Sequence, residues 1–585
     1  MTVEKLITDH IDIWSSALQT RSTAGRGSNG KIDLYGIKKL RELILELAVR
    51  GKLVPQDPND EPASELLKQI AKEREELVKS KAIRKPKALE KIAITNTPFD
   101  LPDGWEWCYL NDIGDWGAGA TPSRSNSKYY NGDIPWFKSG ELSSDFISES
   151  EESITELALQ ECSLRDNKVG DVLIAMYGAT IGKTSILNVR GTTNQAVCAC
   201  TPYSGISNIY LITLLKAYKR VFIGMGAGGA QPNISREKLI ATVFALPPQN
   251  EQKRIIHKVD ELMSLCDQLE QQSLNRLDAH QQLVETLLAT LTDSQNAEVL
   301  AENWARISLH FDTLFTTEVS IDALKQTILQ LAVMGKLVPQ DPNDEPASEL
   351  LKRIEQEKAQ LVKEGKIKKQ KPLPPVSDEE KSFELPDGWE WTTMQGLYPE
   401  FQNGLSSRGS SSGKDSVVIR LADIKNWKVS FADTRAIAIT DSEKQKYCLD
   451  KNDILIVRVN GSADIVGGFV LYDDDQNVCY CDHFIRLRLP YKRVIDENYL
   501  ILVASSTLIR RKINNLFITT AGQKTVNQTH ISSLLFPLPP YKEQKCIVAR
   551  VNELFSLCEQ LKLRLQSAHQ TQLNLADALT DAALN

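Results

Sequence analysis

Residues 51–68 read GKLVPQDPNDEPASELLK, and residues 335–352 repeat these letters without a change. Downstream, LPDGWEW at residues 101–107 returns at residues 385–391 with the same separation. Solenoid proteins repeat every roughly 20 to 50 residues, far less than this period. The chain therefore contains a tandem duplication of a unit as large as a pair of domains.

Between the repeated segments lie two stretches that differ. Residues 108–243 and 392–535 show little similarity to each other. After them the copies agree again, in FALPP at residues 244–248 and FPLPP at residues 536–540. Each half is therefore a shared frame around a divergent insert, as expected if one scaffold holds two different surfaces.

The frame is predicted to be helical on both sides of a proline-rich turn. Apolar residues at helical spacing predict a helix over Ile37–Val49. The segment PQDPNDEP holds three prolines and excludes regular structure. Beyond it, Ser64 is expected to cap a charged helix that reaches about Lys81, and the copy is expected to run from Ser348 to near Gly365.

The inserts show the pattern of compact α+β domains. Short apolar runs such as Asp171–Ala175, Ile454–Val459 and Val478–Ile485 predict strands. Longer apolar stretches at Ile209–Val221 and Tyr499–Ile513 predict helices. Strands and helices mixed in this way indicate the α+β class.

Each insert ends on Leu-Pro-Pro, and a long helix is predicted to follow. Apolar residues three and four apart form a heptad seam on each helix. The seams consist of Val259, Leu262, Cys266, Leu269, Leu277, Gln281, Val284, Leu288 and Leu291, and of Val551, Leu554, Cys558, Leu561, Leu565, Ala568, Gln572, Leu575 and Leu579. About forty helical residues give a rod of roughly 60 Å. Each rod is the obvious partner of the other, and an antiparallel pair would carry the inserts at opposite ends. The alternative is a general coiled-coil scaffold.

The predicted fold is α+β, with two α+β domains joined by an antiparallel pair of long coiled-coil helices, a pseudo-twofold internal duplication and additional helical segments. The expected domains are an N-terminal helical frame (1–99), a first insert domain (100–248), a first long helix (249–297), a central helical frame with its linker (298–384), a second insert domain (385–540) and a second long helix (541–585).

Composition narrows the possible classes of protein. The chain has 585 residues, of which 42% are hydrophobic and 25% charged, as in ordinary globular proteins. No apolar run approaches the length of a membrane span. The ten cysteines are scattered, which fits the reducing cytoplasm. The formal net charge of −7 does not by itself indicate a nucleic-acid partner.

Two glycine motifs resemble nucleotide-binding loops but lack their context. Residues 224–229 match GxGxxG, yet an apparent helix precedes them where a dinucleotide site needs a strand. Residues 178–184 are one residue too short for a phosphate-binding P-loop, and Tyr177 stands where its first glycine belongs. Neither motif predicts a nucleotide site.

Motifs of other DNA enzymes and of metal sites are also incomplete. Adenine methyltransferases need a hydrogen-bond acceptor before Pro-Pro-Tyr, whereas Leu538 stands there. Glu251-Gln-Lys and Glu543-Gln-Lys match half of a nuclease site, without the other carboxylate. Cys198-Ala-Cys and Cys479-Tyr-Cys lack the CxxC spacing of zinc ligands. The sequence therefore predicts no catalytic residue and no metal site.

What the inserts do contain is polar loops that differ between the copies. Arg, Asn, Gln and Asp can contact base edges in the major groove, while Lys, Ser, Thr and glycine-loop amides suit phosphates. In the first insert the candidates for DNA contact are Thr121, Ser123, Arg124, Ser125, Asn126, Lys128, Tyr129, Lys138, Lys183, Thr193, Asn194, Gln195, Gln231 and Asn233. In the second insert they are Arg408, Arg420, Asp423, Lys425, Asn426, Arg458, Asn460, Ser462, Thr520, Gly522, Gln523 and Lys524.

Together these segments resemble the specificity (S, DNA-recognition) subunit of a Type I restriction–modification system. The resemblance rests on LPDGWEW at the start of each insert and on the FALPPQNEQKRI and FPLPPYKEQKCI junctions. Within the first insert it rests on GATPSRSNSKYYNGDIPW (119–136), VLIAMYGATIGKT (172–184), TTNQAV (192–197) and GAQPNIS (229–235). The second insert departs further from the common pattern.

The resemblance implies a non-catalytic subunit with two target-recognition domains, each reading one half of a split DNA sequence, and helices that set the gap. It implies double-stranded DNA, two methylation subunits and motor/nuclease subunits as partners. S-adenosylmethionine, ATP and Mg²⁺ would be bound by those subunits, and none by this chain. The rival interpretations are a stand-alone DNA methyltransferase or nuclease, and a coiled-coil scaffold without DNA contact.

Overall fold

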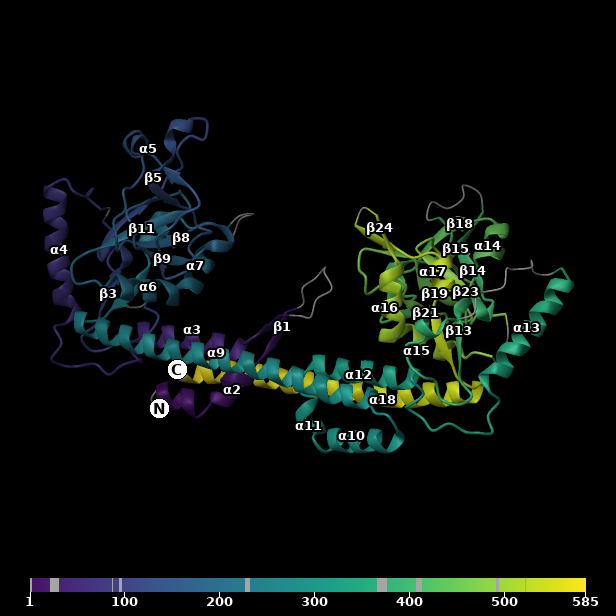
Figure 1. The fold of residues 1–585 in the computed structure, drawn as a ribbon. Helices are drawn as coiled ribbons and strands as arrows, with labels where there is room; N and C mark the ends of the chain where they lie inside the picture. The colour runs from purple at the N-terminus through teal and green to yellow at the C-terminus, as the bar shows by residue number, and fades with distance from the viewer. Residues whose placement is uncertain are drawn as a thin grey trace. The chain divides into compact units, whose positions relative to one another are not determined.

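The computed structural model describes residues 3–21, 31–86, 88–93, 97–226, 232–365, 376–406, 413–490, 494–520 and 522–584. The chain forms two compact units (Figure 1). One comprises Met1–Gln19, Ile32–Leu274 and His569–Asn585, and the other comprises Thr20–Lys31 and Asn275–Ala568. Each unit contains one insert with both helices and sheets, so the predicted mixed fold with two domains is confirmed.

The helices and strands of the first half follow the expected order. Its helices are α1 (Val3–Thr8), α2 (Ile11–Ser16), α3 (Tyr35–Val49), α4 (Ala63–Lys79), α5 (Glu156–Glu161), α6 (Asn208–Ala217), α7 (Lys219–Gly226), α8 (Arg236–Ile240) and α9 (Gln249–Thr292). Its strands are β1 (Gln19–Arg21), β2 (Lys31–Asp33), β3 (Glu106–Tyr109), β4 (Gly114–Ala118), β5 (Tyr130–Phe137), β6 (Phe146–Ile147), β7 (Ser153–Ile154), β8 (Val172–Ala175), β9 (Thr184–Leu187), β10 (Thr192–Thr193), β11 (Val197–Pro202) and β12 (Val243–Leu246).

The second half has a comparable order. Its helices are α10 (Ala297–Leu309), α11 (Phe311–Leu314), α12 (Glu318–Val333), α13 (Ala347–Lys363), α14 (Asp441–Tyr447), α15 (Glu497–Ser505), α16 (Thr507–Leu516), α17 (Gln528–Ser532) and α18 (Tyr541–Leu584). Its strands are β13 (Glu390–Thr393), β14 (Glu400–Asn403), β15 (Lys414–Ile419), β16 (Ile424–Lys425), β17 (Lys428–Val429), β18 (Arg435–Ile439), β19 (Ile454–Val457), β20 (Val459–Asn460), β21 (Phe469–Leu471), β22 (Cys479–Tyr480), β23 (Phe484–Arg488), β24 (Ile518–Thr520), β25 (Gln523–Thr525) and β26 (Leu535–Leu538).

The two inserts share a sheet topology. The larger sheet has the order β4-β11-β8-β9-β6 in the first insert and β14-β23-β19-β21 in the second. A three-stranded sheet accompanies it, β10-β5-β7 in the first and β18-β15-β22 in the second. Helix α6 packs on β8 and β9, and α15 packs on β21 (Figure 1). Duplication therefore extends into the inserts, although their sequences conceal it.

Each insert is closed by a two-stranded antiparallel ladder. Strand β3 pairs with β12, and β13 pairs with β26. The first strand of each ladder opens its insert and the second ends it, so both ends of an insert lie side by side. The residues between the paired strands therefore form a module that leaves the frame and returns to it at the same place.

The charged helix of the frame begins without the expected serine cap. Helix α4 starts at Ala63 after Pro62, with no side-chain cap, so the prediction of Ser64 as the cap was wrong. The Ala63 amide instead donates to the Gly104 carbonyl at 2.8 Å, and Ala347 donates to Gly388 in the same way. The LPDGWEW turn therefore caps this helix in both copies.

Several predicted elements are interrupted in the structure. The helix expected over Ile209–Val221 is divided into α6 and α7, and the one expected over Tyr499–Ile513 is divided into α15 and α16 at Ser506. The strand expected over Val478–Ile485 is two strands, β22 and β23, joined by a turn. Likewise, Ile454–Val459 is divided between β19 and β20.

Two 44-residue helices, α9 and α18, follow the inserts as predicted. In α9 the seam residues Val259, Leu262 and Cys266 are buried. In α18 the seam shifts near its end, since Ala568 and Leu575 are exposed whereas Ala576 is fully buried.

That shift has a local cause. Asp577 accepts a hydrogen bond from the Tyr35 hydroxyl at 2.8 Å and pairs with Lys39 Nζ at 2.8 Å, both from α3. The end of α18 therefore contacts a helix that the heptad pattern does not take into account.

A buried carboxylate fixes the start of each long helix to its frame. Glu251 is 1% exposed and accepts hydrogen bonds from Trp105 Nε1 at 3.0 Å and from Gln56 Nε2 at 3.1 Å. The second copy repeats this around Glu543, which is 4% exposed, with Trp389 at 3.0 Å and Gln340 at 3.1 Å. Burial raises the pKa of both carboxyls. The Glu-Gln-Lys motif thus has a structural role in both copies.

Helices long and apolar enough to cross a membrane do not occur in the described part of the chain. All ten cysteines are free thiols.

Candidate nucleic-acid interface

Loops from distant parts of the first insert are joined by backbone hydrogen bonds. Ala120, after β4, donates to the Thr193 carbonyl at 3.1 Å. Met176, after β8, donates to Ala196 at 2.8 Å and accepts from the Ile234 amide at 2.9 Å. Four loops that carry candidate DNA contacts therefore form one surface.

Side chains on this surface contact one another directly. The Thr121 hydroxyl donates to Gln195 Oε1, which joins two of the sequence-predicted residues. Asn233 is exposed on the neighbouring loop, and Asn194 accepts from the Ala196 amide at 3.1 Å. Thr193 is fully buried and faces the interior, so it does not contribute to the exposed surface.

The remaining candidates of the first insert lie close by in sequence. The segment between β4 and β5 holds Ser123, Arg124, Ser125, Asn126, Lys128 and Tyr129. Tyr129 donates to Glu161 at 2.9 Å, and Asn126 caps the short turn through the Lys128 amide at 3.2 Å. Lys183 is half-buried, and its Nζ donates to the Gly140 carbonyl at 3.3 Å. Gln231 lies outside the described residues.

Two candidate cations share one carboxylate, which the sequence did not indicate. Arg124 Nη1 lies 2.5 Å from Glu152, and Lys138 Nζ lies 2.6 Å from it. The Arg124 guanidinium also stacks on Tyr130 and Trp136, 4.8 and 5.2 Å from the ring centroids. Hydrogen bonds from Arg124 and Lys138 hold the pKa of Glu152 at about 2, so it is ionised at neutral pH. Glu152 thus occupies the position in which an anionic ligand oxygen would meet both cations.

Replacing Glu152 with Gln is expected to strengthen binding to non-cognate DNA. Both cations would then be available to phosphate oxygens, so the dissociation constant at low salt should fall by about threefold to tenfold, with a steeper salt dependence. Fluorescence anisotropy with random-sequence duplexes over a salt series measures both quantities.

Glu151→Gln is the matched control for this change. The Glu151 side chain is 77% exposed, and its carboxylate lies 3.5 Å from Lys138 Nζ. Equal effects of the two substitutions would show that Glu152 contributes only negative charge, and not competition for Arg124.

A three-stranded sheet gathers candidates in the second insert. Strand β25 pairs with both β20 and β24, so that Asn460 lies opposite Lys524, and Thr520 lies opposite Gln523. Gly522 adopts a φ of +79° in the connecting turn, where glycine is favoured. Lys524 Nζ donates to the carbonyl of Gly461 at 2.9 Å, and the amide of Ser462 donates to Asn460 at 2.9 Å.

A second group of candidates lies around β16 and β17. Asp423 is 3% exposed, and its carboxylate accepts from Arg420 Nε at 3.1 Å and Nη2 at 2.9 Å. Asp423 therefore orients Arg420 and is not itself exposed to a ligand. Lys425 and Asn426 are exposed. Arg408 lies outside the described residues.

Sequence reasoning missed the turn that joins β22 to β23. The Arg458 amide donates to the His483 carbonyl at 2.7 Å, and Arg458 Nη1 donates to the Asp482 carbonyl at 3.3 Å. The side chains of Asp482 and His483 are 43% and 46% exposed. The apolar residues on both sides concealed this turn within an apparent strand.

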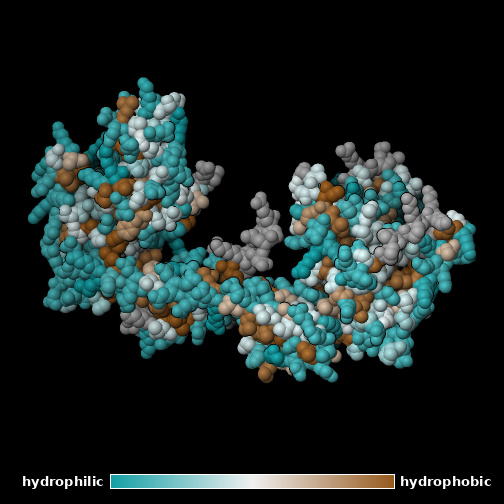
Figure 2. Space-filling model, viewed as in Figure 1, coloured by the Kyte–Doolittle hydropathy of each residue, from teal (hydrophilic) through white to brown (hydrophobic). Residues whose placement is uncertain are grey.

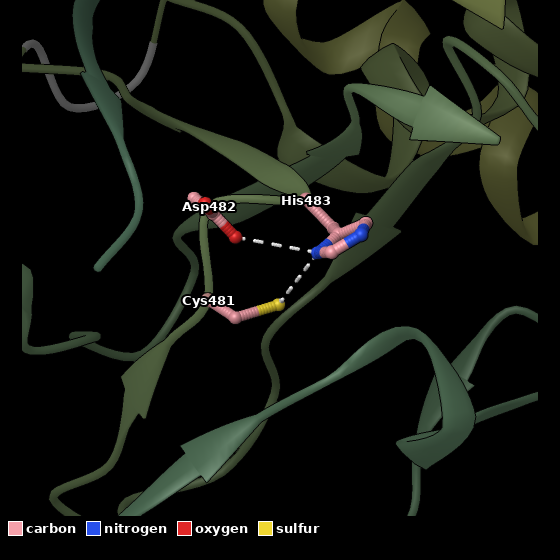
Figure 3. Close-up of side chains that lie close together, drawn as sticks. All are labelled: Cys481, Asp482 and His483. Carbon is pink, nitrogen blue, oxygen red and sulfur yellow. Dashed lines mark hydrogen bonds and ion pairs between the residues drawn. The ribbon is translucent and has the colours of Figure 1, made fainter. Parts of the chain in front are cut away.

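This turn also brings together three kinds of metal-ligating atom (Figure 3). Cys481 Sγ lies 3.8 Å from His483 Nδ1, and Asp482 Oδ1 lies 3.3 Å from the same nitrogen. Burial raises the pKa of the Cys481 thiol to about 11, which disfavours its thiolate while no metal ion is bound.

The surfaces that carry these loops are largely hydrophilic. Figure 2 shows polar side chains over most of the visible face of each insert, with small scattered apolar areas. Such a surface suits contacts to phosphates and base edges, which are polar.

Comparisons with known proteins find similar proteins of a single kind. A family model for the Type I restriction modification DNA specificity domain matches residues 102–279 and 415–567. The chain is 48% identical to the EcoAI specificity subunit of Escherichia coli and 47% identical to the EcoEI specificity subunit, over 100% of each chain in both cases. The HsdS subunit of Thermoanaerobacter tengcongensis has a solved structure that covers 84% of this chain and 99% of its own, with 16% identity and a TM-score of 0.40.

Proposed function

The chain belongs to the family of Type I restriction–modification DNA specificity subunits, and on this premise we propose that each insert is a target-recognition domain for one half of a split, asymmetric DNA sequence. Members of this family recognise DNA and are not themselves catalytic. The observation that supports two different half-sites is that the polar loops of the two inserts carry different side chains. Gln195 and Thr121 lie on one surface, whereas Arg458 and Lys524 lie on the other.

The long helices act in this proposal as a ruler for the gap between half-sites. Support comes from how the helices are shared between the two units. Residues 249–274 of α9 belong to the same unit as residues 569–584 of α18, and the remainders of both helices belong to the other unit. An antiparallel pair would have this arrangement, and it would turn the second domain toward the opposite strand.

The catalytic chemistry is assigned to partner subunits. Two methylation subunits would dock on the helices and frames, supply S-adenosylmethionine and flip the target adenine for N6-methylation. Motor/nuclease subunits that use ATP and Mg²⁺ would complete the restriction complex. Partners that share the phosphate contacts account for a recognition subunit with a net charge of −7. The complex would act in the cytoplasm, where it meets DNA.

Mapping of N6-methyladenine tests the proposal. Genomic DNA from cells that express this chain with its methylation subunit is sequenced by a long-read method, with the methylation subunit alone as control. A single split motif that is methylated only when both are present is the expected result. Methylation without this chain, or at no defined motif, would favour the coiled-coil scaffold instead.

Shortening both long helices by one heptad should shorten the gap. Deletion of residues 271–277 and 566–572, where the two units divide, removes about 10 Å of rod. This equals roughly three base pairs, over which DNA rotates by about 0.3 of a turn. Methylation should therefore weaken and move to a motif with the same half-sites and a shorter gap. An unchanged gap in the mapped motif would refute the ruler.

A further inference from the structure

The two inserts share a pattern of backbone hydrogen bonds that sequence comparison does not show. In the first insert, Asn194 donates to Phe137 at 3.0 Å, and Val197 donates to Asn194 at 3.1 Å. In the second insert, Cys481 donates to Ile419 at 3.0 Å, and Phe484 donates to Cys481 at 3.1 Å. Asn194 and Cys481 therefore hold the same position in the two folds.

Further bonds extend this correspondence on both sides of the turn. Ala120 donates to Thr193, and Leu405 donates to Tyr480 at 2.9 Å. Met176 donates to Ala196 at 2.8 Å, and its counterpart Arg458 donates to His483 at 2.7 Å. The same backbone hydrogen bonds therefore occur in the same order around one connection, which runs from β10 to β11 in the first insert and from β22 to β23 in the second. Asp482 consequently stands where Gln195 stands, and His483 stands where Ala196 stands.

The Asp482 side chain is placed to contact a ligand. It is 43% exposed, but its Oδ1 atom is buried and lies 3.3 Å from Nδ1 of His483 (Figure 3), so the exposure belongs to the rest of the carboxylate. The backbone beneath it is held firmly, because the Asp482 amide donates to Leu405 at 2.8 Å and its carbonyl accepts from Arg458. A carboxylate that is held by a rigid turn and partly exposed is suited to direct contact with a base edge.

From this correspondence, and resting on the proposed function, we propose that Asp482 is a specificity-determining residue of the second domain that accepts a hydrogen bond from the exocyclic amino group of a base. An ionised carboxylate only accepts, so it selects the amino group of cytosine or adenine in the major groove. Gln195, at the same position in the first domain, both donates and accepts. One position thus helps to give the two domains different half-sites.

The test replaces Asp482 with Asn in the full chain, expressed with the methylation subunit. The expected result is relaxed selection at a single base pair of one half-site, with methylation of the original motif reduced by roughly 5-fold to 150-fold. The other half-site and the gap should not change. Gln195→Glu should alter one base pair of the opposite half-site.

Asp475→Asn is the matched control, because Asp475 lies in the same domain, is 83% exposed and pairs with Lys451 at 3.3 Å. It should leave the motif unchanged. Asp482→Glu keeps the carboxylate, so it should lose less selectivity than Asn at the same base pair, and this separates a base contact from a folding defect.

The outcomes distinguish this inference from the proposed function. A wild-type split motif that Asp482→Asn leaves unaltered in sequence and extent would overturn the role of Asp482 alone. Absence of any split motif with the wild-type chain would overturn the proposed function. About one equivalent of zinc in the purified wild-type chain, lost in the Asn variant, would replace base contact with a cation site at Cys481, Asp482 and His483.

Discussion

Exchange of residues 110–242 for the corresponding insert of the EcoAI relative should replace one half of the methylated sequence and leave the other half intact. Strands β3 and β12 stay in place in this chimera, so the ladder that closes the insert is preserved. Because specific sites are bound on the order of 10³-fold or more tightly than other DNA, methylation of the original motif should fall by at least that factor. Mapping of N6-methyladenine would show the new motif.

The reciprocal exchange of residues 394–534 is the matched control. It keeps β13 and β26 and should change the opposite half. If both chimeras altered the same half, or if the gap changed with either, the assignment of one half-site to each domain would be wrong.

Glu543→Ala should destabilise the second unit by about 3 kcal/mol. The substitution leaves the buried Trp389 indole N–H without its acceptor, whereas Gln340 keeps its hydrogen bond to the Gly335 carbonyl at 2.7 Å. An unsatisfied buried donor costs about 1–3 kcal/mol, and the cavity left by the removed side chain adds to this cost. Local opening should increase by roughly 100-fold, which hydrogen–deuterium exchange would locate around β13 and the start of α18. Glu251→Ala should do the same in the first unit.

Glu553→Ala is the control for this loss. Glu553 is 60% exposed on the same helix and pairs with Arg550 at 2.7 Å, so its removal should cost about 0.5 kcal/mol or less. Similar destabilisation by both substitutions would contradict a special role for the buried carboxylate.

The same carboxylates predict a pH dependence with a definite sign. The folded pKa of Glu251 and Glu543 is raised above the ordinary 4.5. The part of their stabilising effect that comes from protonation is therefore full below pH 4.5 and is lost as pH rises through the folded pKa. Relative to the wild type, a Glu251→Gln/Glu543→Gln variant should lose less stability over that interval. Chemical unfolding at a series of pH values measures the difference.

The duplicated frame could be predicted from sequence because its signals are local. Apolar spacing defined α3, and the Leu-Pro-Pro junctions marked the starts of α9 and α18. The cap of α4 could not be predicted, because its acceptor is the carbonyl of Gly104, which is distant in sequence. The shift of the α18 seam had the same kind of cause, since α3 supplies the contacts of Asp577.

The candidate interface was predicted in part. Polar loops such as that of Thr121 and Gln195 were found because polar residues interrupt apolar runs. Burial of Thr193 and Asp423 depends on tertiary contacts, so residue type alone suggested exposure. Asp482 was missed for the opposite reason, as flanking apolar residues suggested a continuous strand.

The closing ladders have a consequence for how such a gene can evolve. Each insert begins and ends on adjacent strands of a frame whose residues 51–68 and 335–352 are identical. A crossover between two alleles within the codons for residues 335–352 would join the first insert of one to the second insert of the other, and the ladder that closes each insert would stay intact. New two-part specificities can then arise when a single recombination event combines whole inserts from two alleles. The number of specificities that a small set of alleles can encode is the number of different first inserts multiplied by the number of different second inserts.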